Sequence, residues 1–461
     1  MKYELTEKKA AHALGVSLSR VSQLVGDKQL DAITINGKVR ISQESVTRYL
    51  EESKRPGRPP RTSYATASRH TLMNADYEVA STVYDTALDD PLSVEEVIDP
   101  SRAPLGVLTT GGRPKKRELN DWWRHRSIPG SRPGLDAKLL SLGIDSPSNL
   151  AVRSMGLSLS DCYWLRPSDS PDLAWADVNF FDNPFVESSP DGWDGWLSGV
   201  GLSSPDNTSE GELPKKWVAD ESGRRLLLKG CRADDQRPYN EAVATALYRR
   251  LLLPEDFVAY DVVETIDGPA SRCANFLKPR EEYVPAIYVK DLGGRIRAAN
   301  NYDRFCRTVA ALGANEAAVR SSLSKMILCD VILANSDRHW RNFGFVRDID
   351  ALELRVAPLF DSGNSLWFDK NDREINARDW AFMARPFAQD AASALACVDD
   401  LSWFNPSALD GFADEACDIL SASRHAAQPG RLDFIREGLE RTIAQVRDAA
   451  KVLVPRIERG R

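Results

Sequence analysis

The sequence predicts an α+β protein in which a small helix-turn-helix head precedes a β-rich part and a helical part. Three observations support this fold class. Capped helices and an Asn36-Gly37 turn occupy residues 1–53. Short runs with strand character recur over 224–276. Apolar residues return at helical spacing over 431–454.

The composition is that of a globular protein with several compact units. The chain has 461 residues, of which 42% are hydrophobic and 28% are charged. It contains no apolar run of about 18 residues, the length that a transmembrane helix needs, and its N-terminus lacks the apolar core of a signal peptide. The seven cysteines include no Cys-x-x-Cys pair. We therefore expect a cytoplasmic protein with no membrane partner and no structural zinc.

The head begins with two short helices. Thr6 is a candidate cap for the first helix, which ends at Gly15. Ser17 can cap the second helix, over 18–25. Two short helices joined by a tight turn that contains glycine are typical of a helix-turn-helix.

A β-hairpin and a third helix follow. Alternating β-branched residues flank Asn36-Gly37, which is a strong hairpin signal. Ser42 then caps a helix over 43–53. A helix-turn-helix with a β-wing resembles excisionase-like or winged DNA-binding domains, and a small protein-interaction module is the alternative.

The charge of the head favours nucleic acid as its partner. Residues 1–61 hold 12 Lys and Arg against 7 Asp and Glu, a net charge of +5, so the remainder of the chain carries −12. Residues 54–70 form a basic linker whose Gly57-Arg58-Pro59 core resembles an AT-hook, and a stiff, basic interdomain linker without DNA contacts is the alternative. The candidate DNA contacts are the polar and basic side chains of the second helix, the wing and the linker: Ser19, Arg20, Ser22, Gln23, Lys38, Arg40, Arg55 and Arg58.

The middle of the chain predicts short strands over 77–84, 94–98 and 104–108, and a helical stretch over 119–143. A polar and then basic loop follows over 202–217. It can cover phosphates with its backbone N–H groups, and Thr208, Ser209 and Gly211 are candidate ATP contacts. A surface hairpin is the alternative for this loop.

A strand over 224–230 carries Lys229, which is placed to neutralise nucleotide phosphates. Glu241 lies at the start of the next helix, over 240–251. It can pair with Lys229, and a helix-dipole role is an equal possibility. A β-hairpin over 258–276 completes this β-rich part, and residues 283–288 then cross to the helical part near the adenine.

The strongest functional signal is the stretch Asn335 to Phe345, followed by a second acidic residue at Asp361. An Asp-x-x-x-x-Asn loop (Asp337 and Asn342) with a later Asp supplies the base and the two metal ligands that phosphoryl transfer uses. Two short strands over 343–346 and 352–356 should place Asn342 and Asp361 at opposite ends of one hairpin. The alternative is a buried Asp337–Arg338 ion pair, with Asp361 an ordinary turn residue.

These residues resemble a known family. NSDRHWRNFGF with APLFDSGNSL is similar to the catalytic and metal-binding segments of HipA-like serine/threonine kinases, the toxin kinases of bacterial toxin–antitoxin modules. The resemblance implies a bilobal protein-kinase-like fold, with a β-rich N-lobe over 201–290 and a helical C-lobe over 291–461, behind a HipA N-terminal-like region over 71–200. It implies ATP and Mg²⁺ as cofactors, Asp337 as catalytic base, and Asn342 and Asp361 as metal ligands.

The resemblance also implies partners and a switch. The partners would be a protein substrate and an antitoxin or a second copy of the chain. Ser204, Thr208 and Ser209 become candidates for inactivating self-phosphorylation. Two other functions stay open: a DNA-binding transcription regulator whose kinase fold senses nucleotide without turnover, and a small-molecule or lipid kinase, because phosphoinositide kinases carry a similar Asp-Arg-His-x-x-Asn string.

Overall fold

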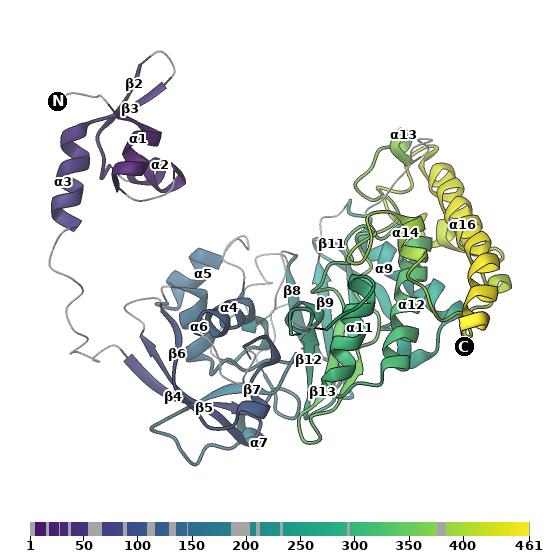
Figure 1. Cartoon of the computed structure of the whole chain (residues 1–461), viewed down its shortest axis with the longest axis horizontal. Coiled ribbons are helices and arrows are strands. Elements are labelled where there is room, and N and C mark those ends of the chain that lie inside the picture. The colour runs from purple at the N-terminus through teal and green to yellow at the C-terminus, as the bar shows by residue number, and fades with distance from the viewer. Residues whose placement is uncertain are drawn as a thin grey trace. The chain divides into compact units, whose positions relative to one another are not determined.

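The computed structural model separates the chain into two compact units, Met1–Ala65 and Thr66–Arg461, which are considered separately below (Figure 1). It describes residues 5–14, 18–26, 28–35, 38–53, 67–85, 90–107, 116–128, 135–144, 146–185, 203–208, 213–230, 234–292, 296–375 and 384–460. Among the helices of these residues, none is both long enough and apolar enough to cross a bilayer.

The first unit contains the helices and the hairpin that the sequence predicts. Its helices are α1 (Glu7–Leu14), α2 (Leu18–Gly26) and α3 (Gln43–Ser53). They pack on a three-stranded sheet of order β1-β3-β2, made of Leu5–Thr6, Lys38–Ile41 and Ala32–Ile35. A small apolar core joins the helices to the sheet and includes Ala10, Val21, Leu24, Leu30, Ile41 and Val46.

Two of the predicted caps are confirmed. The Thr6 hydroxyl accepts a hydrogen bond from the Lys9 backbone N–H at 3.3 Å, and the Ser42 hydroxyl accepts one from Ser45 at 3.3 Å. Ile35 pairs with Lys38, as expected for the hairpin. Ser17 and Asn36-Gly37 lie outside the described residues.

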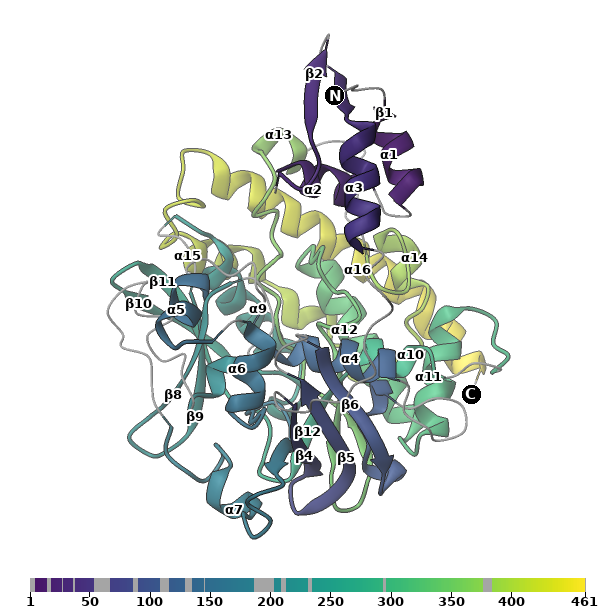
Figure 2. The ribbon, with the colours of Figure 1, turned by 90° about the vertical axis from the view of Figure 1, so that its left-hand side faces the viewer.

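The second unit opens with an antiparallel sheet of order β6-β5-β4-β7. Its strands are β4 (Ala67–Asn74), β5 (Tyr77–Asp85), β6 (Asp90–Val97) and β7 (Tyr163–Pro167). Figure 2 shows α4 beside β6, against which it packs. The described residues of this region also include the helices α4 (Lys116–Arg126), α5 (Leu135–Ser141), α6 (Pro147–Arg153) and α7 (Trp175–Val178).

Three local predictions for this region were wrong. Residues 67–70 do not belong to the linker, because they begin β4 and pair with both β5 and β7. The strand predicted over 104–108 is a 3₁₀ turn over Leu105–Val107. The helical stretch over 119–143 is two separate helices, α4 and α5.

A second antiparallel sheet of order β10-β11-β9-β8 forms the N-lobe. Its strands are β8 (Lys215–Ala219), β9 (Arg225–Gly230), β10 (Tyr260–Thr265) and β11 (Gly268–Ala274). The helix α9 (Arg237–Leu251) packs against β10 and β11, and Val243 and Leu247 on it are fully buried. The N-lobe therefore has the strand-and-helix content that the sequence predicts.

A small third sheet carries the predicted hairpin. It has the order β12-β13-β14, made of Glu281–Pro285, Gly344–Asp348 and Leu354–Val356. Gly344 crosses so close to β12 that a Cβ on it would lie 2.2 Å from the Val284 carbonyl oxygen. The glycine of the Asn-Phe-Gly-Phe string is thus required by close backbone approach.

The C-lobe is helical. It contains α10 (Ala286–Lys290), α11 (Asn301–Ala311), α12 (Glu316–Ile332), α13 (Asp372–Ile375), α14 (Ala391–Leu395), α15 (Phe412–Leu420) and α16 (Arg431–Gly460). The buried α12 packs against α16 (Figure 1). At this contact the Thr442 hydroxyl donates to the Ile332 carbonyl at 2.8 Å.

A buried polar network fixes the first sheet of this unit to β12 and β13. Arg347 on β13 lies 2.5 Å (Nε to Oε1) from Glu282 on β12 and donates to the Tyr163 hydroxyl at 2.6 Å. Asn74 donates to the other Glu282 oxygen at 2.9 Å. All four side chains are at most 3% exposed. The region over 67–185 is therefore tied to the sheet that contains β12 and β13.

Candidate active site

The loop after α12 is anchored by a buried arginine. Arg338 is 1% exposed and binds both carboxylate oxygens of Asp330 at 2.8 and 2.9 Å. It also donates to the carbonyls of Asn342 and Phe360, each at 2.6 Å. The alternative of an Asp337–Arg338 ion pair was therefore wrong. The arginine instead joins the loop over 335–342 to the residue just before Asp361.

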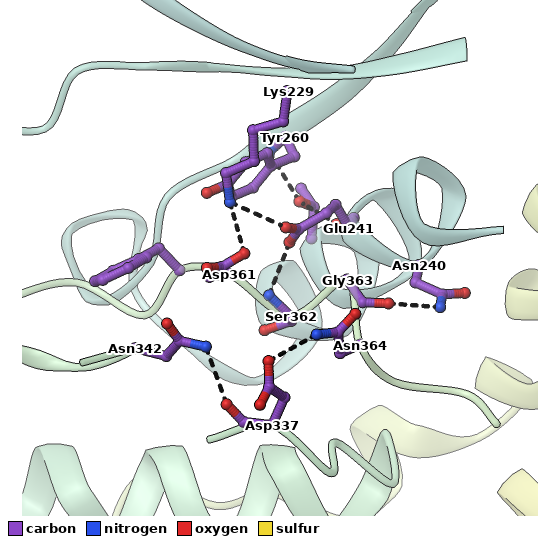
Figure 3. A network of polar contacts seen from close by, with 12 residues as sticks. Lys229, Asn240, Glu241, Tyr260, Asp337, Asn342, Asp361, Ser362, Gly363 and Asn364 are labelled. Atoms are coloured by element: carbon purple, nitrogen blue, oxygen red, sulfur yellow. Dashed lines mark hydrogen bonds and ion pairs between the residues drawn. The ribbon is translucent and has the colours of Figure 1, made fainter. Parts of the chain in front are cut away.

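The three residues of the predicted phosphoryl-transfer motif meet at one cavity. Asp337, Asn342 and Asp361 line a cavity of about 670 Å³ together with Lys229 and Glu241. The Asn342 amide nitrogen donates to the Asp337 carbonyl at 2.9 Å, which leaves its Oδ1 turned away from that bond (Figure 3). The predicted hairpin explains this meeting, because β13 begins just after Asn342 and β14 ends shortly before Asp361.

Lys229 bridges two acidic side chains in the same cavity. Its Nζ lies 2.7 Å from Asp361 and 3.5 Å from Glu241, and the Lys229 and Glu241 side chains are 7% and 4% exposed (Figure 3). Burial raises the pKa of Glu241, and Lys229 opposes that rise. Glu241 therefore forms the ion pair with Lys229, one of the two roles that the sequence left open for it.

The loop over 361–365, which is predicted to bind metal, is held by α9. The second Glu241 oxygen accepts from the Ser362 backbone N–H at 2.9 Å. The neighbouring Asn240 donates to the Gly363 carbonyl at 2.8 Å (Figure 3). It also donates to the Ser365 carbonyl at 2.8 Å. The loop that bears Asp361 and the helix that bears Glu241 thus form one hydrogen-bonded unit.

Asp361 is held in its charged form. Burial would raise its pKa, but Lys229 and then Lys215 outweigh burial and place the pKa well below its usual range. Its backbone φ is +58°, a left-handed conformation that costs about 1–3 kcal/mol in a residue other than glycine. Such strain is expected where a functional side chain must be aimed at a fixed point.

Sequence reasoning missed Lys215, which lines the cavity beside Lys229. The two lysines are direct cross-strand partners on β8 and β9. Like charges placed directly opposite each other destabilise a sheet. Such a pair is favoured only beside anions, and Asp361 is one such anion here. The Pro214-Lys215-Lys216 string was the available signal.

Aromatic residues line the cavity at the crossing between the lobes. Phe276 stacks on Phe360 with ring centres 5.8 Å apart, and Tyr283 meets Phe360 edge-on at 5.4 Å. The cavity wall also includes Tyr288. We expect residues 283–288 to lie near the adenine of a bound nucleotide. Their place on the cavity wall agrees with this expectation, which stays a prediction.

The loop predicted to cover phosphates is described over 203–208 and from 213 onward. Residues Pro205–Thr208 form a buried 3₁₀ turn, so the surface-hairpin alternative was wrong for them. Thr208 is 7% exposed and lines the cavity, and its hydroxyl lies within hydrogen-bond distance of the Leu157 and Pro205 carbonyls. Ser204 is 1% exposed. Ser209 and Gly211 lie outside the described residues.

The predicted DNA contacts are described only in part. Ser22 on α2 is exposed and donates to Glu7 at 3.3 Å, and Arg40 on β3 is half-buried. The remaining candidates lie outside the described side chains: Ser19, Arg20, Gln23, Lys38, Arg55 and Arg58. The DNA interface therefore stays a prediction.

Comparison with solved structures identifies the architecture. A chain of HipA from Shewanella oneidensis MR-1, solved as a toxin–antitoxin complex with HipB and operator DNA, matches 83% of this chain over 99% of its own length. The TM-score is 0.50 and the sequence identity is 14%. The fold is that of a HipA-like kinase.

Two further matches accompany this HipA-like fold. The crystal structure of the Helicobacter pylori proinflammatory kinase CtkA matches 52% of this chain and 94% of its own, with a TM-score of 0.40 and 14% identity. In sequence, the serine/threonine-protein kinase CtkA of Helicobacter pylori strain J99 is 36% identical over 67 residues. The aligned part is 12% of this chain and only about a fifth (21%) of the relative's length. No family model matches the chain.

Proposed function

We propose that this chain is a serine/threonine protein kinase that transfers the γ-phosphoryl group of Mg²⁺-bound ATP to a hydroxyl group. The observation that carries the proposal is the convergence of Asp337, Asn342 and Asp361 with the Lys229–Glu241 ion pair on one cavity. Each of these groups has a defined task in phosphoryl transfer. The HipA-like fold supports the proposal, because it accounts for both lobes that enclose the cavity.

The donor atoms present fit a magnesium ion. Asn342 offers an amide oxygen and Asp361 a carboxylate that Lys229 and Lys215 keep ionised, and Mg²⁺ prefers such hard oxygen ligands. Asn342 and Asp361 would be the protein ligands of the ion, and nucleotide phosphates and water would supply its remaining ligands. When bound, the ion would neutralise charge on the β- and γ-phosphate oxygens. Lys229 would neutralise the α- and β-phosphates.

Asp337 is the proposed catalytic base. As the acceptor hydroxyl oxygen bonds to the γ-phosphorus, its proton passes to the Asp337 carboxylate. The bond between the γ-phosphorus and the β,γ-bridging oxygen breaks, and its electron pair leaves on ADP. Two hydrogen bonds hold the loop around Asp337 for this step: the Asp337 backbone N–H donates to Asn335 Oδ1 at 3.0 Å, and the Arg338 guanidinium donates to the Asn342 carbonyl at 2.6 Å.

The proposal is tested by incubating the purified chain with Mg²⁺ and γ-labelled ATP, then measuring intact mass and mapping phosphopeptides. Label on a serine or threonine of the chain or of an added protein supports the proposal. Nucleotide binding without transfer to any acceptor would favour the nucleotide-sensing regulator instead. Transfer to a small molecule or lipid alone would show that the acceptor class is wrong.

Removal of Asp361 should uncouple nucleotide binding from magnesium. We expect Asp361→Ala to bind ADP with the same affinity in Mg²⁺ and in EDTA, whereas the intact chain should bind at least about tenfold more tightly with Mg²⁺. Titration calorimetry measures both constants. Asp369→Ala, at an exposed position on the same segment, is the control and should keep the magnesium dependence. Unchanged dependence in Asp361→Ala would exclude Asp361 as a ligand.

The proposed kinase could also phosphorylate itself, but two of the three candidate hydroxyl groups are buried. Ser204 and Thr208 are buried in the conformation seen here, so either hydroxyl must leave its packing before it can meet the γ-phosphate. Phosphopeptide mapping of the labelled chain distinguishes these two positions from Ser209.

We also propose that the first unit binds DNA, and that an antitoxin-like partner or a second copy of the chain assembles with the kinase. The solved HipA neighbour is itself a complex with HipB and operator DNA. The predicted helix-turn-helix elements α1 and α2 and the basic charge of residues 1–61 support the DNA assignment.

Two arginines test the DNA assignment. We expect Arg20→Ala combined with Arg58→Ala to weaken DNA binding and to lower its salt dependence, because each lost phosphate contact releases about one counterion fewer. Kinase turnover should stay unchanged. Gel shifts at several salt concentrations measure the effect, and Arg69→Ala on the second unit is the control. If the double variant retards DNA in the gel at the same protein concentration as the intact chain, the DNA-binding assignment is wrong.

A further inference from the structure

A side chain outside the predicted motif holds the carboxylate of the proposed base. The Asn364 amide nitrogen donates to Asp337 Oδ2 at 2.6 Å (Figure 3). A backbone bond runs alongside it, from the Ser336 N–H to the Asn364 carbonyl at 3.2 Å. Asn364 thus links its own loop, over 361–365, to the loop over 335–342 through both its side chain and its backbone.

Asn364 is itself held in place. The residues on either side of it, Gly363 and Ser365, both accept hydrogen bonds from the buried Asn240 amide at 2.8 Å. Asn240 is fully buried on α9. The donor that reaches Asp337 is therefore mounted on a rigid part of the fold, the condition under which a supporting contact can fix catalytic geometry.

The two carboxylate oxygens of Asp337 have different surroundings. Oδ2 receives the Asn364 amide, whereas His339 Nε2 lies 4.0 Å from Oδ1, beyond hydrogen-bond distance. The His339 ring is fixed by its Nδ1, which accepts the Arg341 backbone N–H at 3.2 Å. Asp337 lines the cavity, so Oδ1 is the oxygen left for an acceptor hydroxyl.

We infer that Asn364 is a positioning residue, which fixes Asp337 Oδ2 so that Oδ1 meets the proton of the acceptor hydroxyl. The inference rests on the proposed kinase function. The terminal torsion of an aspartate is broad, so without a fixed partner the carboxylate rotates. A displacement of about 1 Å at a reacting group costs roughly 100-fold in rate. A neutral amide suits this task because it donates one hydrogen bond and competes for no proton.

The test compares Asn364→Ala, Asn364→Asp and a control, Asn371→Ala, at an exposed asparagine that caps α13. Both Asn364 variants keep the backbone bond from Ser336. We expect kcat for phosphoryl transfer to fall roughly 10- to 100-fold in Asn364→Ala. The fall should be larger in Asn364→Asp, which removes the donor and places a second carboxylate beside Asp337. The Kd for Mg²⁺-bound ADP should stay within about twofold, which a collapsed loop would not allow.

A double variant separates positioning from a merely structural role. In an Asp337→Ala background, Asn364→Ala should lower the residual rate no further, because residues that act as one unit are not additive. Wild-type kcat in Asn364→Ala, or a full additional loss in the double variant, would overturn this inference while leaving the proposed function intact. An intact chain that transfers no phosphate to any acceptor would overturn the proposed function and this inference together.

Discussion

Replacing Asp337 by alanine should lower phosphoryl transfer by about 10²- to 10⁴-fold, the usual contribution of a positioned general base. The variant loses the carboxylate that faces the cavity, but it keeps the backbone bonds of Asp337 to Asn335, His339 and Asn342. Lys229, Asn342 and Asp361 also remain. We therefore expect the affinity for Mg²⁺-bound nucleotide to change little, and calorimetry beside a labelled-ATP assay measures both quantities.

DNA binding by the same variant should be unaffected, because residues 1–65 form a compact unit of their own. Asp369→Ala serves as the matched control for losing one acidic side chain. A near-normal transfer rate in Asp337→Ala would mean that the base is another group or that the hydroxyl needs none. Loss of DNA binding in this variant would mean that the two units function as one.

Replacing Arg338 by alanine should destabilise the second unit by about 3–5 kcal/mol, which is typical for breaking a buried ion pair by removal of one partner. The substitution strands the Asp330 carboxylate, 8% exposed, without its cation. It also leaves the carbonyls of Asn342 and Phe360 without their donor. Urea unfolding, followed by circular dichroism, measures the free energy of unfolding.

The control for Arg338 is Arg355→Ala, which breaks an exposed ion pair with Glu281 at 2.9 Å. Exposed pairs contribute about 0–1 kcal/mol, so this variant should unfold close to the intact chain. Equal unfolding midpoints for the two variants would show that Arg338 does not anchor the loop. Arg338→Ala combined with Asp330→Asn should recover part of the loss, because the stranded charge is then gone.

Much of the candidate active site follows from local sequence pattern. The short strands between Asn342 and Asp361 place the two residues at the ends of one hairpin. A strand that carries Lys229, followed by a helix with Glu241, makes their ion pair one of two roles that the sequence offers, and the structure contains that pair. Each of these pairs of residues is separated by no more than two helices or strands along the chain. Local alternation and capping signals are enough to place such neighbours.

The features that escaped prediction depend on contacts between distant segments. No local pattern indicates that 281–285 pairs with β13, or that residues 67–70 join two strands at once. Arg338 pairs with Asp330 near the C-terminal end of α12, although Asp337 is closer to Arg338 in sequence. Asn364 is 27 residues from the carboxylate that it holds. Such pairings are decided by packing and by the satisfaction of buried polar groups.

The bond from Thr442 on α16 to the last turn of α12 has a consequence for biosynthesis. Thr442 is fully buried and donates to the Ile332 carbonyl, immediately before the loop that bears Asp337. During translation the ribosome makes that loop about a hundred residues before Thr442, as the separation of 110 positions requires. A nascent chain interrupted before α16 would lack this support, so full enzymatic competence would arise only after the C-terminal helix has docked.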